Sequence, residues 1–154
     1  DITHFAECKL AGKIANEVEH FRQEHSNLHI EFDVEAKLSD YLLLVDSRAV
    51  LRALNNLLSN ASRYATTRIK VGLCTDLQDC VLTVEDDGPG INSTLWEKIF
   101  QPFAQLENLQ RDSASGHGLG LAIVSDIARA HGGTLRLGKS EDLGGLLADI
   151  VIAR

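Results

Sequence analysis

The sequence predicts a single α+β domain, because segments with helical and strand-like spacing of apolar residues alternate along its 154 residues. Residues 28–34 alternate apolar and polar side chains, as a half-buried strand does. The segment from Phe5 to Gln23 instead has helical spacing of Leu10, Ile14, Val18 and Phe21. Hydrophobic residues make up 44% of the chain and charged residues 24%, which indicates a globular protein with a substantial core. With no linker or repeat visible, we expect residues 1–154 to form one domain.

The first half of the chain contains a further strand and an amphipathic helix. Tyr41–Val45 is a continuous apolar run and predicts a strand that is more buried than the one at 28–34. The segment from Ser47 to Ala65 predicts a helix, and Asp46 or Ser47 can cap its first turn. Its apolar stripe consists of Val50, Leu54, Leu57, Leu58, Ala61 and Ala65.

The second half predicts a hairpin, two helical segments and two closing strands. A polar turn at residues 76–79 separates the hairpin strands, and Pro102 interrupts the chain after the first helical segment. The span from Ala104 to Ser115 has no clear periodicity and predicts a loop. The expected elements are strands Arg68–Thr75 and Cys80–Glu85, helices Leu95–Phe100 and Gly116–Ala130, and strands Thr134–Lys139 and Leu146–Ala153.

Charge and cysteine content exclude several classes of protein. The net charge of −7 argues against general binding to nucleic acid or to anionic membranes, which requires a basic surface. The three cysteines, Cys8, Cys74 and Cys80, form neither a disulfide framework nor a metal-binding pattern. No apolar run is long enough to span a bilayer. These features fit a cytosolic setting.

The helix from Ser47 to Ala65 carries a possible site for a metal-bound phosphate chain. Spacings of four and three residues place Asn56, Asn60 and Arg63 on one arc beside the apolar stripe. Carboxamide oxygens can ligate a hard cation, and a guanidinium can neutralise phosphate. The alternative is an ordinary solvated polar face, which most amphipathic helices have.

Two glycine-rich stretches add to this pattern. In Asp86-x-Gly88-x-Gly90 the glycines allow a tight turn and a close ligand, and Asp86 can accept a hydrogen bond at the strand end. The alternative is a common Asp-Gly turn. Gly116-x-Gly118-Leu119-Gly120 opens a helix, where free N–H groups can face an anion. It matches neither a P-loop nor a Rossmann turn, and its alternative is a flexible helix entry without ligand.

These motifs, with Phe103 between them, occur in an order that resembles the ATP-binding catalytic domain of bacterial two-component sensor histidine kinases. That domain belongs to the superfamily of DNA gyrase, the ninety-kilodalton heat-shock chaperones and MutL. The resemblance covers nearly the whole chain. It implies the Bergerat-type fold, a two-layer α/β sandwich in which a mixed sheet has helices on one face.

The resemblance also implies roles for the helix residues. Asn60 matches the asparagine that ligates Mg²⁺ between the phosphates of ATP, and Asn56 matches its partner one turn earlier. Arg63 matches a basic residue at the phosphates, and Tyr64 a ring beside the adenine. In the superfamily's ATPases and anti-sigma serine kinases a glutamate stands where Asn56 is here. Since an amide is too weak a base to activate water or a hydroxyl, this position favours transfer to histidine.

The turn and loop residues match the rest of an ATP pocket. Asp86 matches the carboxylate that accepts a hydrogen bond from the adenine amino group, and Gly88 and Gly90 shape the base pocket. Phe103 belongs to a phenylalanine box, and residues 104–115 match the ATP lid. The positions that match the phosphate border are Gly116, Gly118, Leu119 and Gly120. The chain departs from the family at Gln105, where an arginine is frequent, and Arg111 is a possible substitute.

The phosphoacceptor motif His-Glu-x-x-x-Pro is absent from the sequence. We therefore expect a catalytic domain that binds Mg–ATP and transfers phosphate to a histidine on a separate dimerisation domain, without autophosphorylation by itself. The implied setting is the cytoplasmic domain of an inner-membrane sensor, monomeric as a fragment, with a cognate response regulator as partner. The alternatives are a nucleotide-binding regulatory module with weak catalysis, which Gln105 permits, and an anti-sigma-type serine kinase, which Asn56 disfavours.

Overall fold

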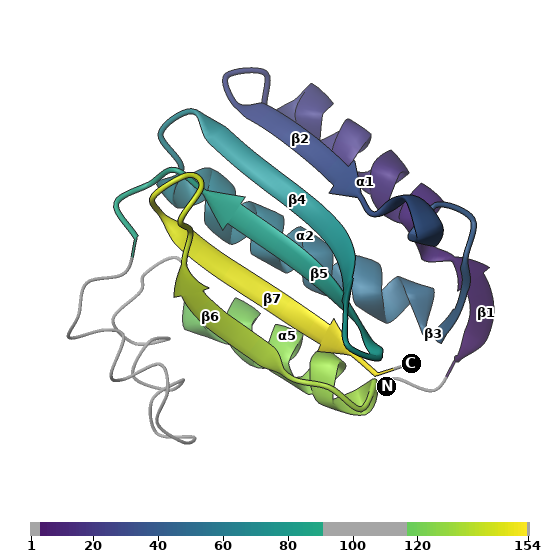
Figure 1. Cartoon of the computed structure of the whole chain (residues 1–154). Coiled ribbons are helices and arrows are strands. Elements are labelled where there is room, and N and C mark those ends of the chain that lie inside the picture. The colour runs from purple at the N-terminus through teal and green to yellow at the C-terminus, as the bar shows by residue number, and fades with distance from the viewer. Residues whose placement is uncertain (1–3, 91–116, 154) are drawn as a thin grey trace.

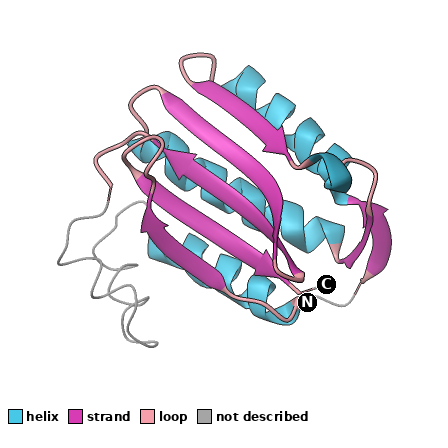
Figure 2. Ribbon diagram, in the orientation of Figure 1, coloured by secondary structure: helices cyan, strands magenta, loops and turns pink. Residues whose placement is uncertain are grey.

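A computed structural model describes residues 4–90 and 117–153 and shows a curved sheet with helices packed on one face (Figure 1 and Figure 2). In chain order the strands are β1 (Ala6–Lys9), β2 (His29–Val34), β3 (Leu42–Val45), β4 (Arg68–Asp76), β5 (Asp79–Asp86), β6 (Leu135–Lys139) and β7 (Leu146–Ile152). The helices are α1 (Leu10–Glu24), α2 (Ser47–Tyr64) and α5 (His117–Ala130), with a 3₁₀ turn at Ala36–Leu38.

The main sheet has five strands in the order β2-β4-β5-β7-β6. Strand β2 is parallel to β4, and the other neighbouring pairs are antiparallel. This is the mixed sheet, covered by helices on one face, that the resemblance implied. The central strand β5 pairs with β4 on one side and β7 on the other, and its carboxyl end leads into the Asp86–Gly90 turn, so the middle of the sheet positions that turn.

The three helices bury their apolar stripes against the sheet, and α2 lies between α1 and α5 (Figure 1). Among the fully buried side chains are Ile14 of α1, Leu54 and Leu58 of α2, Leu121 of α5 and Leu82 of β5. Each buried large aliphatic side chain contributes about 1.5–3 kcal/mol of transfer free energy. The helix predicted from Ser47 to Ala65 is confirmed to within one residue, and the Asp46 side chain caps it by accepting from Ala49 N at 3.2 Å.

Two sequence predictions at the start of the chain were wrong. Residues Ala6–Lys9 form strand β1 instead of the first turns of a helix, because they pair antiparallel with β3. Strand β3 is not more buried than β2: Leu43 and Val45 point into the core, but Leu42 and Leu44 are 52% and 63% exposed. The two strands form a separate two-stranded ribbon whose outer face is uncovered, so an apolar run here does not indicate burial on both faces.

The remaining boundaries differ little from the predictions. The hairpin strands extend to Asp76 and Asp79, so that the turn consists of Leu77 and Gln78, with Leu77 at a φ of 56°. Helix α5 ends as expected before Gly132, which has a φ of 76°. The predicted helix at 95–100 and loop at 104–115 lie outside the described residues. None of the described helices is long and apolar enough to cross a membrane.

Candidate functional site

The structure brings three of the predicted motifs to one end of the domain. An ideal Cβ on Gly120, in the first turn of α5, would lie 3.7 Å from the side-chain nitrogen of Asn60 on α2. A Cβ on Gly88 would lie 2.2 Å from the carbonyl oxygen of Tyr64 at the end of α2. The late turns of α2 therefore contact both the turn after β5 and the start of α5, and only glycine fits at Gly88.

The two asparagines present buried amides that lack partners. Nδ2 of Asn56 and Nδ2 of Asn60 are both inaccessible to solvent and make no hydrogen bond within the part of the chain that the structure describes. A buried donor without a partner costs about 1–3 kcal/mol. Because native structures satisfy most such groups, two of them one helical turn apart indicate a polar ligand at this face.

Asp86 is buried at the end of β5, with 3% of its surface exposed. Its Oδ1 accepts hydrogen bonds from Gly88 N at 2.9 Å and from Leu146 N at 3.4 Å. Among the described residues nothing donates to Oδ2. Burial raises the pKa of this carboxyl above its usual range, and the hydrogen bonds from Gly88 and Leu146 offset part of that effect. The Asp86 carboxylate is thus fixed through one oxygen and retains acceptor capacity on the other.

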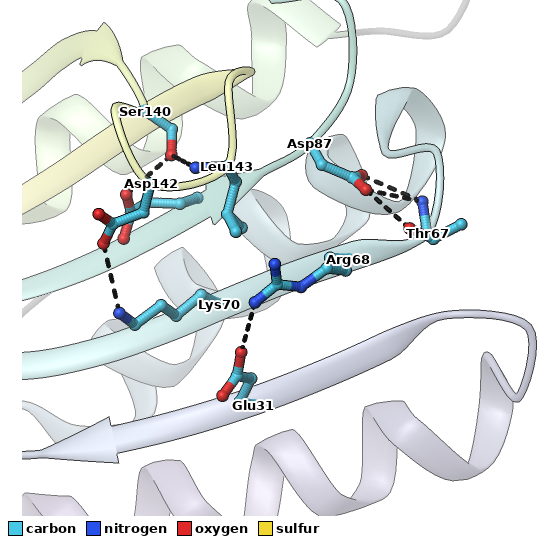
Figure 3. A network of polar contacts seen from close by, with 9 residues as sticks. Glu31, Thr67, Arg68, Lys70, Asp87, Ser140, Asp142 and Leu143 are labelled. Atoms are coloured by element: carbon cyan, nitrogen blue, oxygen red, sulfur yellow. Dashed lines mark hydrogen bonds and ion pairs between the residues drawn. The ribbon is translucent and has the colours of Figure 1, made fainter.

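Asp87 anchors the same turn to the segment that follows α2. Its carboxylate accepts from Thr66 N at 2.8 Å. It also accepts from Thr67 N at 3.0 Å and from the Thr67 hydroxyl (Figure 3). Burial raises the pKa of Asp87, but hydrogen bonds involving Arg68, Thr67 and Thr66 outweigh it and lower the pKa to about 2. The turn is therefore held at the position where Gly88 meets Tyr64.

The loop between β6 and β7 completes the Asp86 pocket, and the sequence did not predict this role. Gly145 N donates to the Asp86 carbonyl at 3.0 Å, and a Cβ on Gly145 would lie 2.2 Å from Asp86 Oδ1. Ser140, fully buried, donates through Oγ to Glu85 Oε1 at 2.9 Å and accepts from Leu143 N at 3.0 Å (Figure 3). The Gly144-Gly145 pair was visible as a turn, but its contact with Asp86 joins segments about 60 residues apart in the chain.

The other predicted site residues differ in how much the structure says of them. Arg63 and Tyr64 end α2, and both are exposed, Tyr64 by 42%. Gly90 has a φ of 75° and lies against Gly145. Gly118 and Leu119 belong to the first turn of α5, beside Gly120. Phe103 and Gly116, with the predicted lid, lie outside the described residues.

The donor set at this site fits a magnesium–nucleotide complex better than a metal held by protein alone. Within the described residues no group of three His, Cys, Asp or Glu side chains could hold a metal ion. Magnesium commonly takes one or two protein oxygens and completes its shell with water and substrate phosphates. An amide rotated by half a turn exchanges its oxygen and nitrogen, so Asn56 and Asn60 can offer oxygen to a cation or N–H to phosphate.

Comparison with known proteins gives a consistent result. Residues 45–150 match the family of histidine kinase-, DNA gyrase B- and HSP90-like ATPases. The chain is 42% identical to the sensor protein RstB of Escherichia coli K12 over 112 residues, which is 73% of this chain and 26% of RstB. It is also 42% identical to the sensor histidine kinase CpxA of the same organism over 100 residues, 64% of this chain and 21% of CpxA. The chain thus spans about a quarter of these relatives.

Solved structures show the same relationship. The catalytic domain of histidine kinase ThkA, in a nucleotide-free form, matches with a TM-score of 0.80 and 27% identity over 98% of this chain and 96% of that one. The histidine kinase domain of the Escherichia coli osmosensor EnvZ matches with a TM-score of 0.67 and 32% identity, over 99% and 89% of the two chains. The chain therefore belongs to the histidine kinase-, DNA gyrase B- and HSP90-like ATPase family, as an ATP-binding catalytic domain of the sensor histidine kinase type.

Proposed function

We propose that this domain binds Mg–ATP between α2, the Asp86–Gly90 turn and the start of α5, and transfers the γ-phosphoryl group to a histidine on a separate domain. The observation that carries the proposal is that one end of the domain contains both a buried carboxylate and two buried amides with unused hydrogen-bonding capacity. Among the described residues nothing donates to Oδ2 of Asp86, and nothing accepts from Nδ2 of Asn56 or of Asn60. The fold requires neither feature, and together they match a ligand with a base at one end and phosphates at the other.

In this proposal the adenine lies against the Asp86 turn. Oδ2 of Asp86 accepts a hydrogen bond from the exocyclic amino group, while Gly88 N and Leu146 N hold Oδ1 in place. Gly88 and Gly90 leave room for the base, and the ring of Tyr64 lies beside it. A buried carboxylate acceptor discriminates against guanine, which presents a carbonyl oxygen at the equivalent position, because two acceptors would then face each other without a proton.

The phosphates lie between α2 and the start of α5. Asn60 supplies an amide oxygen to Mg²⁺, Asn56 supports it from one turn earlier, and Arg63 neutralises phosphate charge. The metal, when bound, supplies charge neutralisation along the phosphate chain. The N–H groups at the start of α5 face the phosphates, at Gly118, Leu119 and Gly120, with Gly116 and Phe103 assigned from the sequence alone.

Phosphoryl transfer then depends on position and charge more than on proton transfer. The lone pair of a neutral imidazole nitrogen forms the N–P bond as the bond from the γ-phosphorus to the bridging oxygen breaks, and ADP leaves with those electrons. The remaining ring N–H proton passes to solvent. Because imidazole already offers a lone pair, no general base is needed, which agrees with an amide at Asn56.

Calorimetric titration with a non-hydrolysable ATP analogue, with and without Mg²⁺, tests the binding step. We expect metal-dependent binding by the wild type and at least 10-fold weaker binding by Asp86→Asn, which replaces Oδ2 by a donor. Asp33→Asn, on an exposed position of β2, is the matched control and should bind as the wild type does. Equal binding by Asp86→Asn and wild type would show that the adenine does not occupy this pocket.

Addition of a phosphoacceptor domain from a sensor kinase tests the transfer step. We expect an acid-labile, alkali-stable phosphoamino acid on the added domain and none on this chain alone. We propose that the complete protein is an inner-membrane sensor whose cytoplasmic part contains this domain and passes phosphate to a response regulator. Binding without transfer would favour a regulatory nucleotide module, and an acid-stable phosphoserine would favour the anti-sigma type.

A further inference from the structure

A groove of about 620 Å³ lies at the opposite end of the α2–α5 helix pair from the Asn60 site. The early turns of α2 and the later turns of α5 form its walls, since the two helices run antiparallel. The apolar lining of the groove consists of Ala49 of α2 and of Ile123 and Ile127 of α5. The groove is also lined by Arg48 and Arg52 of α2. Neither Asn60 nor Gly120 lines the groove, so the inference drawn from it is independent of the proposed nucleotide function.

Arg48 and Arg52 lie at positions where a positive charge does not stabilise helix α2. Arg48 and Arg52 are one helical turn apart and exposed, and like charges at this spacing repel. They also lie in the first turns of α2, where the helix dipole disfavours a cation, and no acidic residue occupies that first turn. In the described residues neither arginine makes an ion pair or a hydrogen bond. The chain as a whole has a net charge of −7, so two arginines at one groove without an ion pair among the described residues contrast with its overall acidic character.

Two carboxylates, those of Asp46 and Asp126, also line the groove, and both have hydrogen-bond or ion-pair partners. Asp46 accepts from Ala49 N through Oδ1 and from His4 N through Oδ2, at 3.2 and 3.3 Å. Asp126 of α5 pairs with Arg129 in the next turn. Arg129, which does not line the groove, neutralises Asp126, whereas the backbone donors leave the charge of Asp46 in place. Arg48 and Arg52 therefore exceed the remaining negative charge along the groove by one, and a ligand that complements this excess is acidic.

We propose that this groove binds an acidic amphipathic helix of a partner protein. The apolar side of that helix covers Ile123, Ile127 and Ala49, and two carboxylates three or four residues apart reach Arg48 and Arg52. A helix fits because both lining features are linear: Ile123 and Ile127 are four residues apart on α5, as the arginines are on α2. A small anion would satisfy the arginines alone and leave the apolar wall in contact with water.

Selection from a displayed library of amphipathic helices tests the proposal. The library keeps one apolar face constant and randomises the flanking positions, and the complete chain is the target. We expect the enriched sequences to contain Asp or Glu pairs three or four residues apart. Their synthetic peptides should bind at least 10-fold more weakly to Arg48→Gln/Arg52→Gln, and their affinity should fall as salt rises.

The control variant Lys13→Gln/Lys139→Gln removes two exposed positive charges elsewhere and should bind the peptides nearly as the wild type does. No enrichment, enrichment without an acidic pair, or equal loss in both double variants would overturn the proposal. Titration with inorganic phosphate, followed by the amide resonances of α2 and α5, provides a second arm. Saturable shifts at Arg48 and Arg52 with phosphate alone would identify a small-anion site instead of a helix-binding groove.

Discussion

Replacement of Gly145 by alanine tests the Asp86 pocket where its packing is tightest. The added Cβ would lie 2.2 Å from Asp86 Oδ1, 2.5 Å from the Asp86 carbonyl oxygen and 2.8 Å from Gly88 N. Two of these three atoms belong to the backbone and cannot rotate away, so the Asp86 turn and the Gly145 loop must separate. The separation also weakens the hydrogen bonds from Gly145 N and Leu146 N to Asp86.

The expected loss of stability follows from these two effects. Overpacking of a well-packed site costs about 1–3 kcal/mol, and each weakened hydrogen bond about 1 kcal/mol. We therefore expect Gly145→Ala to lower the free energy of unfolding by about 3 kcal/mol, which for a domain of this size lowers the Tm by about 6–12 °C. Because the Asp86 carboxylate moves with the turn, affinity for the ATP analogue should fall at least 10-fold.

Urea and thermal denaturation, followed by calorimetric titration, measure both outcomes. Gly138→Ala is a suitable control, because a Cβ there meets only Leu147 Cδ2, at an ordinary distance of 3.7 Å. If Gly145→Ala melts within about 2 °C of Gly138→Ala and binds the analogue as the wild type does, the reasoning is refuted. Such a result would mean that the loop can move away from Asp86 at little cost.

Three further substitutions give separate tests. Asp87→Asn should destabilise the domain by about 1 kcal/mol at pH 7, because solvent screening reduces the roughly 2 kcal/mol that the pKa shift alone would give. Since the pKa of Asp87 is lowered to about 2 in the folded protein, the difference in stability between wild type and variant should persist above pH 4 and vanish as the pH falls toward 2. Urea titrations across that pH range measure this difference. Ser140→Ala should cost about 1–3 kcal/mol, because Leu143 N–H and Glu85 lose a buried partner, and an unchanged urea midpoint would contradict this. Asn60→Leu should raise the Tm of the ligand-free domain by a few degrees, because it removes a buried donor that lacks a partner among the described residues. The same substitution should abolish Mg²⁺-dependent nucleotide binding. A lower Tm would show that the amide has a structural partner.

Most of the fold could be predicted because its elements are encoded by local spacing. The apolar stripe of α2, the alternation in β2 and the polar turn between β4 and β5 predicted those elements to within one or two residues. The ribbon of β1 and β3 could not be predicted in this way. Strand β1 is defined by its pairing with residues 42–45, which local sequence does not reveal. The apolar residues of β1 and β3 are equally compatible with the start of a helix or with a buried strand.

The sequence predicted those parts of the candidate site that lie in contiguous motifs, and it did not predict the parts that depend on contacts between distant segments. Asp86, Gly88 and the asparagines of α2 are each part of a short recognisable pattern, and the structure places them together. Gly145 and Ser140 were missed because their role is a contact with Glu85 and Asp86, which lie more than 50 residues earlier in the chain. Local sequence shows that a turn is present there, but not which strand end the turn supports.

Three of the site residues that the sequence motifs predict lie where their side chains destabilise the fold. Asn56 and Asn60 bury donors without partners, and Asp86 holds a carboxylate where burial raises its pKa. A chain selected for stability alone would place apolar side chains at these positions, as it does at Leu57 and Leu58 between them. Departures from local folding rules are therefore informative about binding, and the proposed nucleotide site contains three of them. Arg48 and Arg52 meet it as well, at the other end of the same two helices, and for the same physical reason we expect a ligand there.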